Sequence, residues 1–76
     1  MEKTYKTKDL AEASALLTYG VNLLEIFREG NLCWFIFDDR ENCEGISNQF
    51  FFGKLMVNAR DYYESMSRLK NRIFSL

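Results

Sequence analysis

The sequence predicts a small α+β domain in which helices cover a three-stranded, mixed sheet. Three segments repeat apolar residues at helical spacing, and two apolar runs on either side of Gly30 have the length of strands. Hydrophobic residues make up 47% of the 76 residues and aromatic residues 16%, which is ample core material for one domain in a chain too short for two. We therefore predict a single domain over residues 1–76, with the element order β-α-β-β-α-(β)-α.

The first part of the chain has the pattern of a short strand followed by a helix. Residues 4–6 carry a strand signal, and Thr7 is a suitable N-cap for a helix over residues 8–19. Gly20 stands where helices often end in a left-handed residue. The apolar stripe of this helix consists of Leu10, Ala13, Leu16 and Leu17.

Two strands joined by a tight turn are predicted next. Residues 21–28 and 31–37 are the strands, and Glu29-Gly30 is the turn. The second strand is apolar on both faces, so we place it at the centre of the sheet, antiparallel to both neighbours, in the order first–third–second. In this arrangement Trp34 is expected to be buried beneath the first helix.

The second half of the chain predicts two more helices. Asp38 and Glu41 have the spacing of a capping box that begins a helix, and Gly53 ends it. Residues 54–57 form either an extended connector or a fourth strand at the sheet edge. Asn58 then caps the last helix, whose apolar side consists of Tyr62, Met66, Leu69 and Ile73.

Three stretches of the sequence carry a resemblance to a known family. They read T-K-D-L-A-E-A-S-A-L-L-T-Y-G, C-W-F-I-F-D-D and F-F-F-G-K-L-M-V-N-A-R-D-Y-Y-E-S-M-S-R-L-K. On these residues, from Tyr5 to Phe74, the chain resembles a small family of uncharacterised proteins of bacteria, archaea and their viruses or mobile elements. The resemblance implies a domain type and a viral or mobile-element origin, and it carries over no catalytic residue.

The residue types that most enzymes need are scarce. The chain has no histidine, its four glycines are isolated, and two cysteines ten residues apart cannot form a four-ligand zinc shell. The acidic residues between 38 and 44 are typical of a helix cap and a solvated face rather than of a Mg²⁺ site. We expect no catalysis, metal or cofactor, and we expect Cys33 and Cys43 to be buried free thiols.

The compartment expected from these features is the cytoplasm, or the host cytoplasm if the protein is viral. Free thiols are typical of a reducing compartment. No stretch approaches the roughly 18 uncharged apolar residues that span a membrane. We therefore expect no membrane partner.

Charge is distributed unevenly along the chain. Residues 1–8 carry a net charge of +2, residues 9–53 of −6 and residues 54–76 of +3. The basic ends suggest an accessory nucleic-acid-binding protein as an alternative function. The sequence pI of about 5.3 is low for such a protein. The candidate residues of this nucleic-acid patch are Lys6, Arg68 and Arg72.

Three consecutive phenylalanines give the best candidate for a partner interface. Successive helical positions differ by about 100°, so three rings spread over more of the helix surface than a small core covers. Phe50 belongs to the core by its spacing. Phe51 and Phe52 either pack beneath the following connector or contact a partner. The function predicted on this basis is a protein-interaction or assembly module that self-associates or binds another protein.

Overall fold

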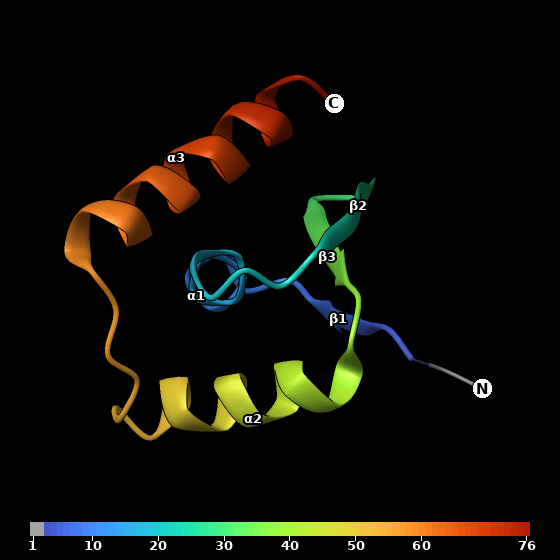
Figure 1. Cartoon of the computed structure of the whole chain (residues 1–76). Coiled ribbons are helices and arrows are strands. Elements are labelled where there is room, and N and C mark those ends of the chain that lie inside the picture. The colour runs from blue at the N-terminus through green and yellow to red at the C-terminus, as the bar shows by residue number, and fades with distance from the viewer. Residues whose placement is uncertain (1–2) are drawn as a thin grey trace.

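The computed structural model describes residues 3–76 and confirms the α+β class. Its elements are β1 (Tyr5–Thr7), α1 (Leu10–Thr18), β2 (Leu23–Glu29), β3 (Leu32–Phe37), α2 (Arg40–Phe51) and α3 (Ala59–Phe74). Figure 1 shows α1 between α2 and α3, with the sheet along one side of this helical group. Met1 and Glu2, which belong to the basic amino-terminal segment, lie outside the described residues.

The strand order is β1-β3-β2, as the sequence predicts, with β3 antiparallel to both neighbours. The expectation of a mixed sheet was wrong, because β1 and β2 run in the same direction but are not hydrogen-bonded to each other. Of the two alternatives for residues 54–57, the connector is confirmed and the fourth strand is wrong. Residues 54–57 adopt no strand conformation, and Leu55 packs against the core instead.

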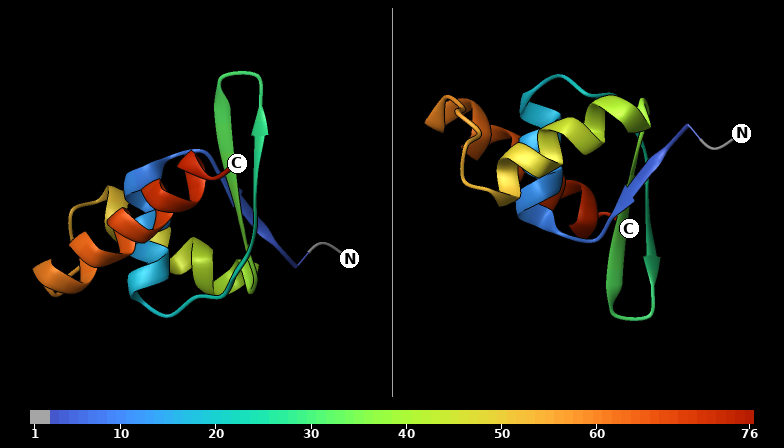
Figure 2. Two further views of the ribbon diagram at one scale, coloured as in Figure 1. Left: turned by 90° about the horizontal axis from the view of Figure 1, so that it is seen from above. Right: turned by 90° about the horizontal axis from the view of Figure 1, so that it is seen from below.

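The core lies between the sheet and the helices. Phe35 and Phe37 of β3 are almost completely buried and meet Leu16 of α1, Cys43 of α2 and Leu69 of α3. Each helix contributes only a few core residues because a 76-residue chain buries a limited share of its surface. The two views of Figure 2 show the helices gathered on one side of the sheet, and no helix of residues 3–76 covers the other.

Trp34 is not buried beneath α1, which corrects the expectation from the sequence. Side chains alternate across a strand, and Phe35 and Phe37 both point into the core. Trp34 and Ile36 therefore lie on the opposite face of the sheet, where both are half-buried. The apolar run of β3 predicted burial on both faces, whereas the chain supplies helices for only one.

Several element boundaries differ from the predicted ones by a few residues. Thr7, the predicted N-cap of the first helix, belongs to β1 and pairs with Phe35 of β3. The N-cap of α1 is Asp9, whose carboxylate accepts a hydrogen bond of 3.1 Å from the Glu12 amide. Glu29 pairs with Leu32, so the hairpin turn is Gly30-Asn31 rather than Glu29-Gly30. Gly30 has the positive φ (62°) that a two-residue hairpin turn needs at its first central position.

The two remaining helices begin at capped positions. The expected capping box of Asp38 is replaced by Asp39, which has a left-handed φ of 61° and accepts a hydrogen bond from the Asn42 amide. The predicted cap of the last helix is confirmed, because Asn58 accepts a 3.0 Å hydrogen bond from the Asp61 amide. Among residues 3–76, no helix combines the length and the apolar character that a bilayer crossing requires.

Candidate functional site

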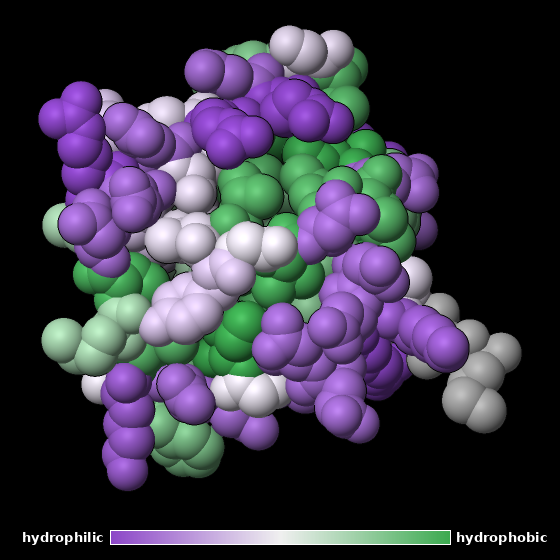
Figure 3. Space-filling model, viewed as in Figure 1, coloured by the Kyte–Doolittle hydropathy of each residue, from purple (hydrophilic) through white to green (hydrophobic). Residues whose placement is uncertain are grey.

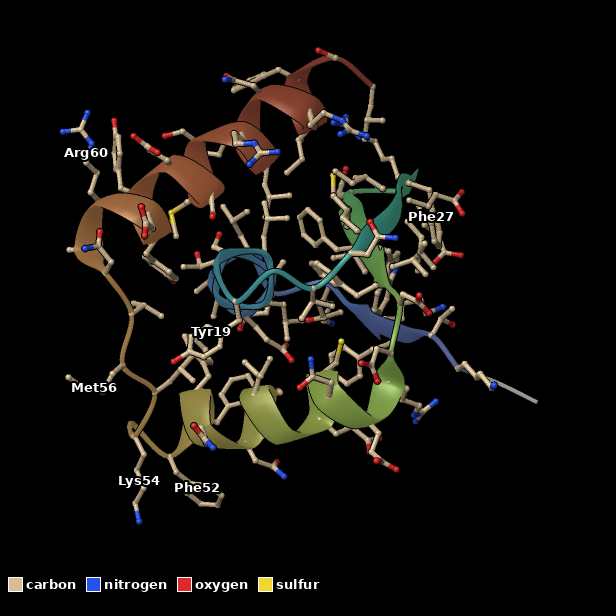
Figure 4. All side chains as sticks on the ribbon, viewed as in Figure 1. Tyr19, Phe27, Phe52, Lys54, Met56 and Arg60 are labelled. Carbon is tan, nitrogen blue, oxygen red and sulfur yellow. The ribbon has the colours of Figure 1, made fainter. Side chains whose placement is uncertain are left out.

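Exposed apolar side chains gather where α2 ends and the connector to α3 begins. Phe51 is 61% exposed, Phe52 77% and Met56 82%. Figure 4 shows Phe52 and Met56 pointing outward from this end of the molecule, and Figure 3 shows hydrophobic atoms reaching the surface there. We call this surface the aromatic corner; it consists of Tyr19, Phe51, Phe52, Met56 and Val57.

Local structure fixes the backbone of the aromatic corner. Gly53 has a φ of 72°, and the amides of Gly53 and Lys54 donate to the carbonyls of Phe50 and Gln49 at 3.1 and 2.9 Å. These bonds form a Schellman motif, which ends α2 and directs the chain away from the core. The Tyr19 hydroxyl donates a hydrogen bond to the Met56 carbonyl, so the connector is attached to the end of α1.

Phe50, the first phenylalanine of the run, was predicted to be a core residue, but it is not part of the core cluster. Phe50 is half-buried, and its ring meets that of Phe51 edge to face at a centroid distance of 5.1 Å. The connector does not cover Phe51 or Phe52. Of the two interpretations that the sequence left open for these rings, packing beneath the connector is therefore wrong.

The structure brings together two of the three residues of the predicted nucleic-acid patch. Arg68 and Arg72, one turn apart on α3, line a cleft of about 580 Å³ next to the turn between α1 and β2. Apolar side chains, among them Leu17, Val21 and Leu69, line this cleft beside polar ones, and Figure 3 shows hydrophobic atoms between α3 and the sheet beneath hydrophilic side chains. Within residues 3–76 neither arginine forms an ion pair, whereas Arg60 pairs with Glu64 at 3.2 Å.

Lys6, the third residue of the predicted patch, does not line this cleft. It lies on the side of the sheet that the helices leave open. Its ammonium is 4.8 Å from the centroid of the Trp34 ring and 5.9 Å from that of Phe27. The predicted patch is therefore divided between two surfaces.

The open face of the sheet is a second apolar surface, which the sequence analysis missed. Phe27 is the cross-strand partner of Trp34, and Figure 4 shows Phe27 pointing away from the helices. The indole N–H of Trp34 donates to the Glu29 carboxylate at 3.2 Å. The sequence of β2 contains a signal that could have revealed this face. Side chains alternate along a strand, so Phe27 lies on the same face as the charged residues Glu25 and Glu29, and Ile26 lies on the core face.

A buried carboxylate is the other feature without a counterpart in the sequence analysis. Glu12 is only 3% exposed, and it accepts hydrogen bonds from Tyr5 (2.6 Å), Thr7 (2.6 Å) and Ser47 (2.5 Å). Burial, followed by the hydrogen bond to Glu12, raises the pKa of Tyr5. Because these hydroxyls come from β1 and α2, the cluster ties both elements to α1.

The cysteines are free thiols in different surroundings. Cys33 is half-buried, which corrects the expectation that it is buried, and Cys43 is fully buried. Burial raises the pKa of Cys43 to about 11, and the nearby Asp39 adds to the effect. The Cys43 thiol is therefore protonated at neutral pH. In the part of the chain that the structure describes, no three acidic, cysteine or histidine side chains are placed to hold a metal ion.

Comparison with known families supports the resemblance noted from the sequence. A model described as a domain of unknown function, DUF5659, matches residues 2–75. The chain belongs to the DUF5659 family. No curated protein and no solved structure matches this DUF5659 domain. Its surfaces therefore have to be interpreted from their own chemistry.

Proposed function

We propose that this DUF5659 domain is a protein-interaction or assembly module that self-associates through the aromatic corner. The observation that carries the proposal is the exposure of Phe51 and Phe52, at 61% and 77%. Phenylalanine is among the residues enriched in interfaces, and clustered exposed apolar residues mark contact sites. A small domain with a limited core also gains stability from a partner subunit.

The two exposed phenylalanine rings supply a large part of the energy that a dimer needs. Fully burying one phenylalanine side chain is worth about 1.5–3 kcal/mol, and a twofold contact buries the same ring on both copies. Two rings on each of two copies supply at most about 6–12 kcal/mol, whereas a micromolar dissociation constant needs about 8 kcal/mol beyond a cost of association of about 4 kcal/mol or more. The other residues of the aromatic corner therefore have to contribute to the contact. The acidic middle and basic ends of the chain add attraction that salt screens.

The proposal is one of binding without catalysis. We place the domain in the cytoplasm, or in the host cytoplasm if a virus or mobile element encodes it. Both statements stay predictions from the sequence and the family resemblance.

Nucleic-acid binding is the alternative function, and one observation favours it. Arg68 and Arg72 lie together in one cleft without acidic partners among the described residues. The separate position of Lys6 and the apolar side chains that line the cleft speak against a continuous phosphate track. If this alternative holds, Arg72→Ala weakens binding of an oligonucleotide and reduces its dependence on salt.

Light scattering across a dilution series tests self-association. We expect wild-type protein to form a dimer at micromolar concentration, and Phe51→Ser and Phe52→Ser to shift the equilibrium to monomer. Phe74→Ser is the matched control, because Phe74 is 87% exposed at the other end of α3. A wild-type monomer at high concentration would overturn the proposal, and a dimer that neither corner variant disturbs would remove the aromatic corner from it.

A further inference from the structure

The sheet exposes a face that has the composition of an interface. Trp34 and Ile36 of β3 and Phe27 of β2 are half-buried there, and Leu32 is 42% exposed. Figures 1 and 2 show all three helices on the other side of the sheet. We call this surface the open sheet face; it consists of Lys6, Glu25, Phe27, Leu32, Trp34 and Ile36.

The central strand makes this exposure unusual. Antiparallel sheets with one face in water normally alternate apolar and polar residues, so the solvent side is polar. The solvent side of β3 is instead Leu32, Trp34 and Ile36. The Lys6 side chain covers part of this face, with its ammonium 4.8 Å from the centroid of the Trp34 ring. An apolar surface of another molecule would bury the side chains that this face exposes.

The register of the sheet places two opposite charges symmetrically about β3. Lys6 of β1 and Glu25 of β2 are both cross-strand partners of Ile36, one on each side. They therefore lie at the same level along β3, separated by two strand spacings, or about 10 Å. Both residues also line one hollow of about 430 Å³ together with Phe27, Ile36 and Arg40, and Arg40 pairs with Glu44 on α2 at 3.1 Å.

We propose that a second copy of the chain stacks its open sheet face on that of the first, about a twofold axis parallel to β3. This axis exchanges the two edges of the sheet, so β1 of one copy lies over β2 of the other. Because Lys6 and Glu25 share a level, each Lys6 then faces Glu25 of the second copy, and the ion pair forms twice. The aromatic rings and Ile36 meet between the pairs, as in stacked sheets about 10 Å apart.

The charges of the face select a second copy over other occupants. Stacking removes water from the Lys6 ammonium, and a buried ammonium needs a carboxylate, which Glu25 of the second copy supplies. A twofold axis perpendicular to the strands would instead place like charges on the same edge. A nucleic acid would bring phosphates close to the carboxylate of Glu25 on this face and to that of Glu29, which accepts from the Trp34 indole.

This inference rests on the proposed self-association and gives it a second surface, separate from the aromatic corner. The open sheet face lies on β1, β2 and β3, whereas the corner lies at the far ends of α1 and α2. A chain that uses both contacts binds two neighbours and forms species larger than a dimer. Variants at the two surfaces therefore report on each contact independently.

Charge reversal with rescue tests the proposed axis. All proteins in this test carry Phe52→Ser, which removes the contact at the aromatic corner. Sedimentation equilibrium is measured for this parent protein and for its Lys6→Glu, Glu25→Lys and Lys6→Glu/Glu25→Lys variants. We expect each single reversal to weaken association about tenfold or more, and the double variant to recover most of it. Lys70→Glu, at an exposed position on α3, is the control and should have little effect.

Trp34 provides a second readout, because it is the only tryptophan of the chain. We expect its emission to shift to shorter wavelength as the concentration rises through the association, and the single reversals to move that shift to higher concentration. If Trp34 emission shifts with concentration but the double variant does not recover association, the proposed twofold axis is wrong. Association without any shift would overturn the surface.

The outcomes also separate this inference from the proposed function. If Phe51→Ser and Phe52→Ser abolish association and the charge reversals change nothing, the aromatic corner stands and the open sheet face is refuted. If a monomeric wild-type protein shows Trp34 quenching by a single-stranded oligonucleotide, a second copy is the wrong occupant. Equal thermal midpoints of the variants at low concentration confirm that the exposed substitutions leave the fold intact.

Discussion

The two faces of β3 carry equally apolar side chains but differ in how far these side chains are buried. Phe35 and Phe37 are 1% and 0% exposed in the core, whereas Trp34 and Ile36, their neighbours in sequence, are half-buried on the open sheet face. The difference does not come from residue type. It comes from the position of α1, which covers one face and is itself enclosed by α2 and α3 (Figure 1).

This comparison shows how a short chain distributes a limited amount of helix. α3 packs on α1 and contributes Leu69 to the core, so it does not cover the second face of the sheet. Two helices enclosing a third give a well-buried helix with Glu12 and Ser14 inside. The consequence is an aromatic sheet face left for contact with another molecule.

The largest expected difference between the faces is in stability. Phe35→Ala should lower the free energy of unfolding by about 3–5 kcal/mol, because it removes a ring from a closed core and leaves a cavity. Urea denaturation at low protein concentration measures the loss. Phe74→Ala, at an 87% exposed position, should stay within about 0.5 kcal/mol of wild type. Equal losses in the two variants would contradict the described core.

The Glu12 cluster strengthens the covered side, and its removal should have the next largest effect. Glu12→Ala takes the acceptor from Tyr5, Thr7 and Ser47 and should cost about 2–4 kcal/mol of unfolding free energy. Glu12→Gln keeps one acceptor oxygen and should lose less. A Glu12→Ala protein as stable as wild type would show that the cluster is not a structural tie.

Alkaline pH should weaken the covered side through Cys43. Its pKa is raised in the folded protein to about 11 from an ordinary value of 9.0. The unfolded chain therefore loses this proton first, so the stabilisation is complete below about pH 9 and is lost as the pH rises towards 11. The loss should amount to about 2–3 kcal/mol over that interval.

Chemical denaturation of wild type and of Cys43→Ala at pH 8 to 11 measures this loss of unfolding free energy. The variant should show a smaller slope, and the slope that remains above pH 10 is expected from Tyr5 and Tyr62, whose pKa values are raised mainly by burial. Parallel slopes in both proteins would mean that Cys43 is not protected in the fold.

The smallest expected effect belongs to the open sheet face. Trp34→Ala should lower the unfolding free energy of the monomer by only about 1–2 kcal/mol. The Trp34 side chain is half-buried, so the substitution removes only a partly buried ring and its contact with Lys6. Circular dichroism during urea unfolding measures it. A loss as large as that of Phe35→Ala would mean that Trp34 is buried in the monomer, as the sequence analysis expected.

The sequence predicted the fold better than the surfaces. Helical spacing, Gly20, Gly53 and the Asn58 cap located the three helices to within a few residues. The exposure of Phe51 and Phe52 was one of two alternatives that periodicity could not separate, because three adjacent rings cannot all face one core. Lys6 was grouped with Arg68 and Arg72 from charge along the chain, which contains no information on distance in space.

The sequence by itself determined the strand order, because a strand as apolar as β3 is placed at the centre and a hairpin makes β2 and β3 neighbours. Only the tertiary structure decided which face of β3 is covered. Both sets of alternating side chains on β3 are apolar, so its own pattern is the same whichever set faces α1. The choice depends on how α1 packs against the whole sheet, and that packing also buries Glu12 and exposes Trp34.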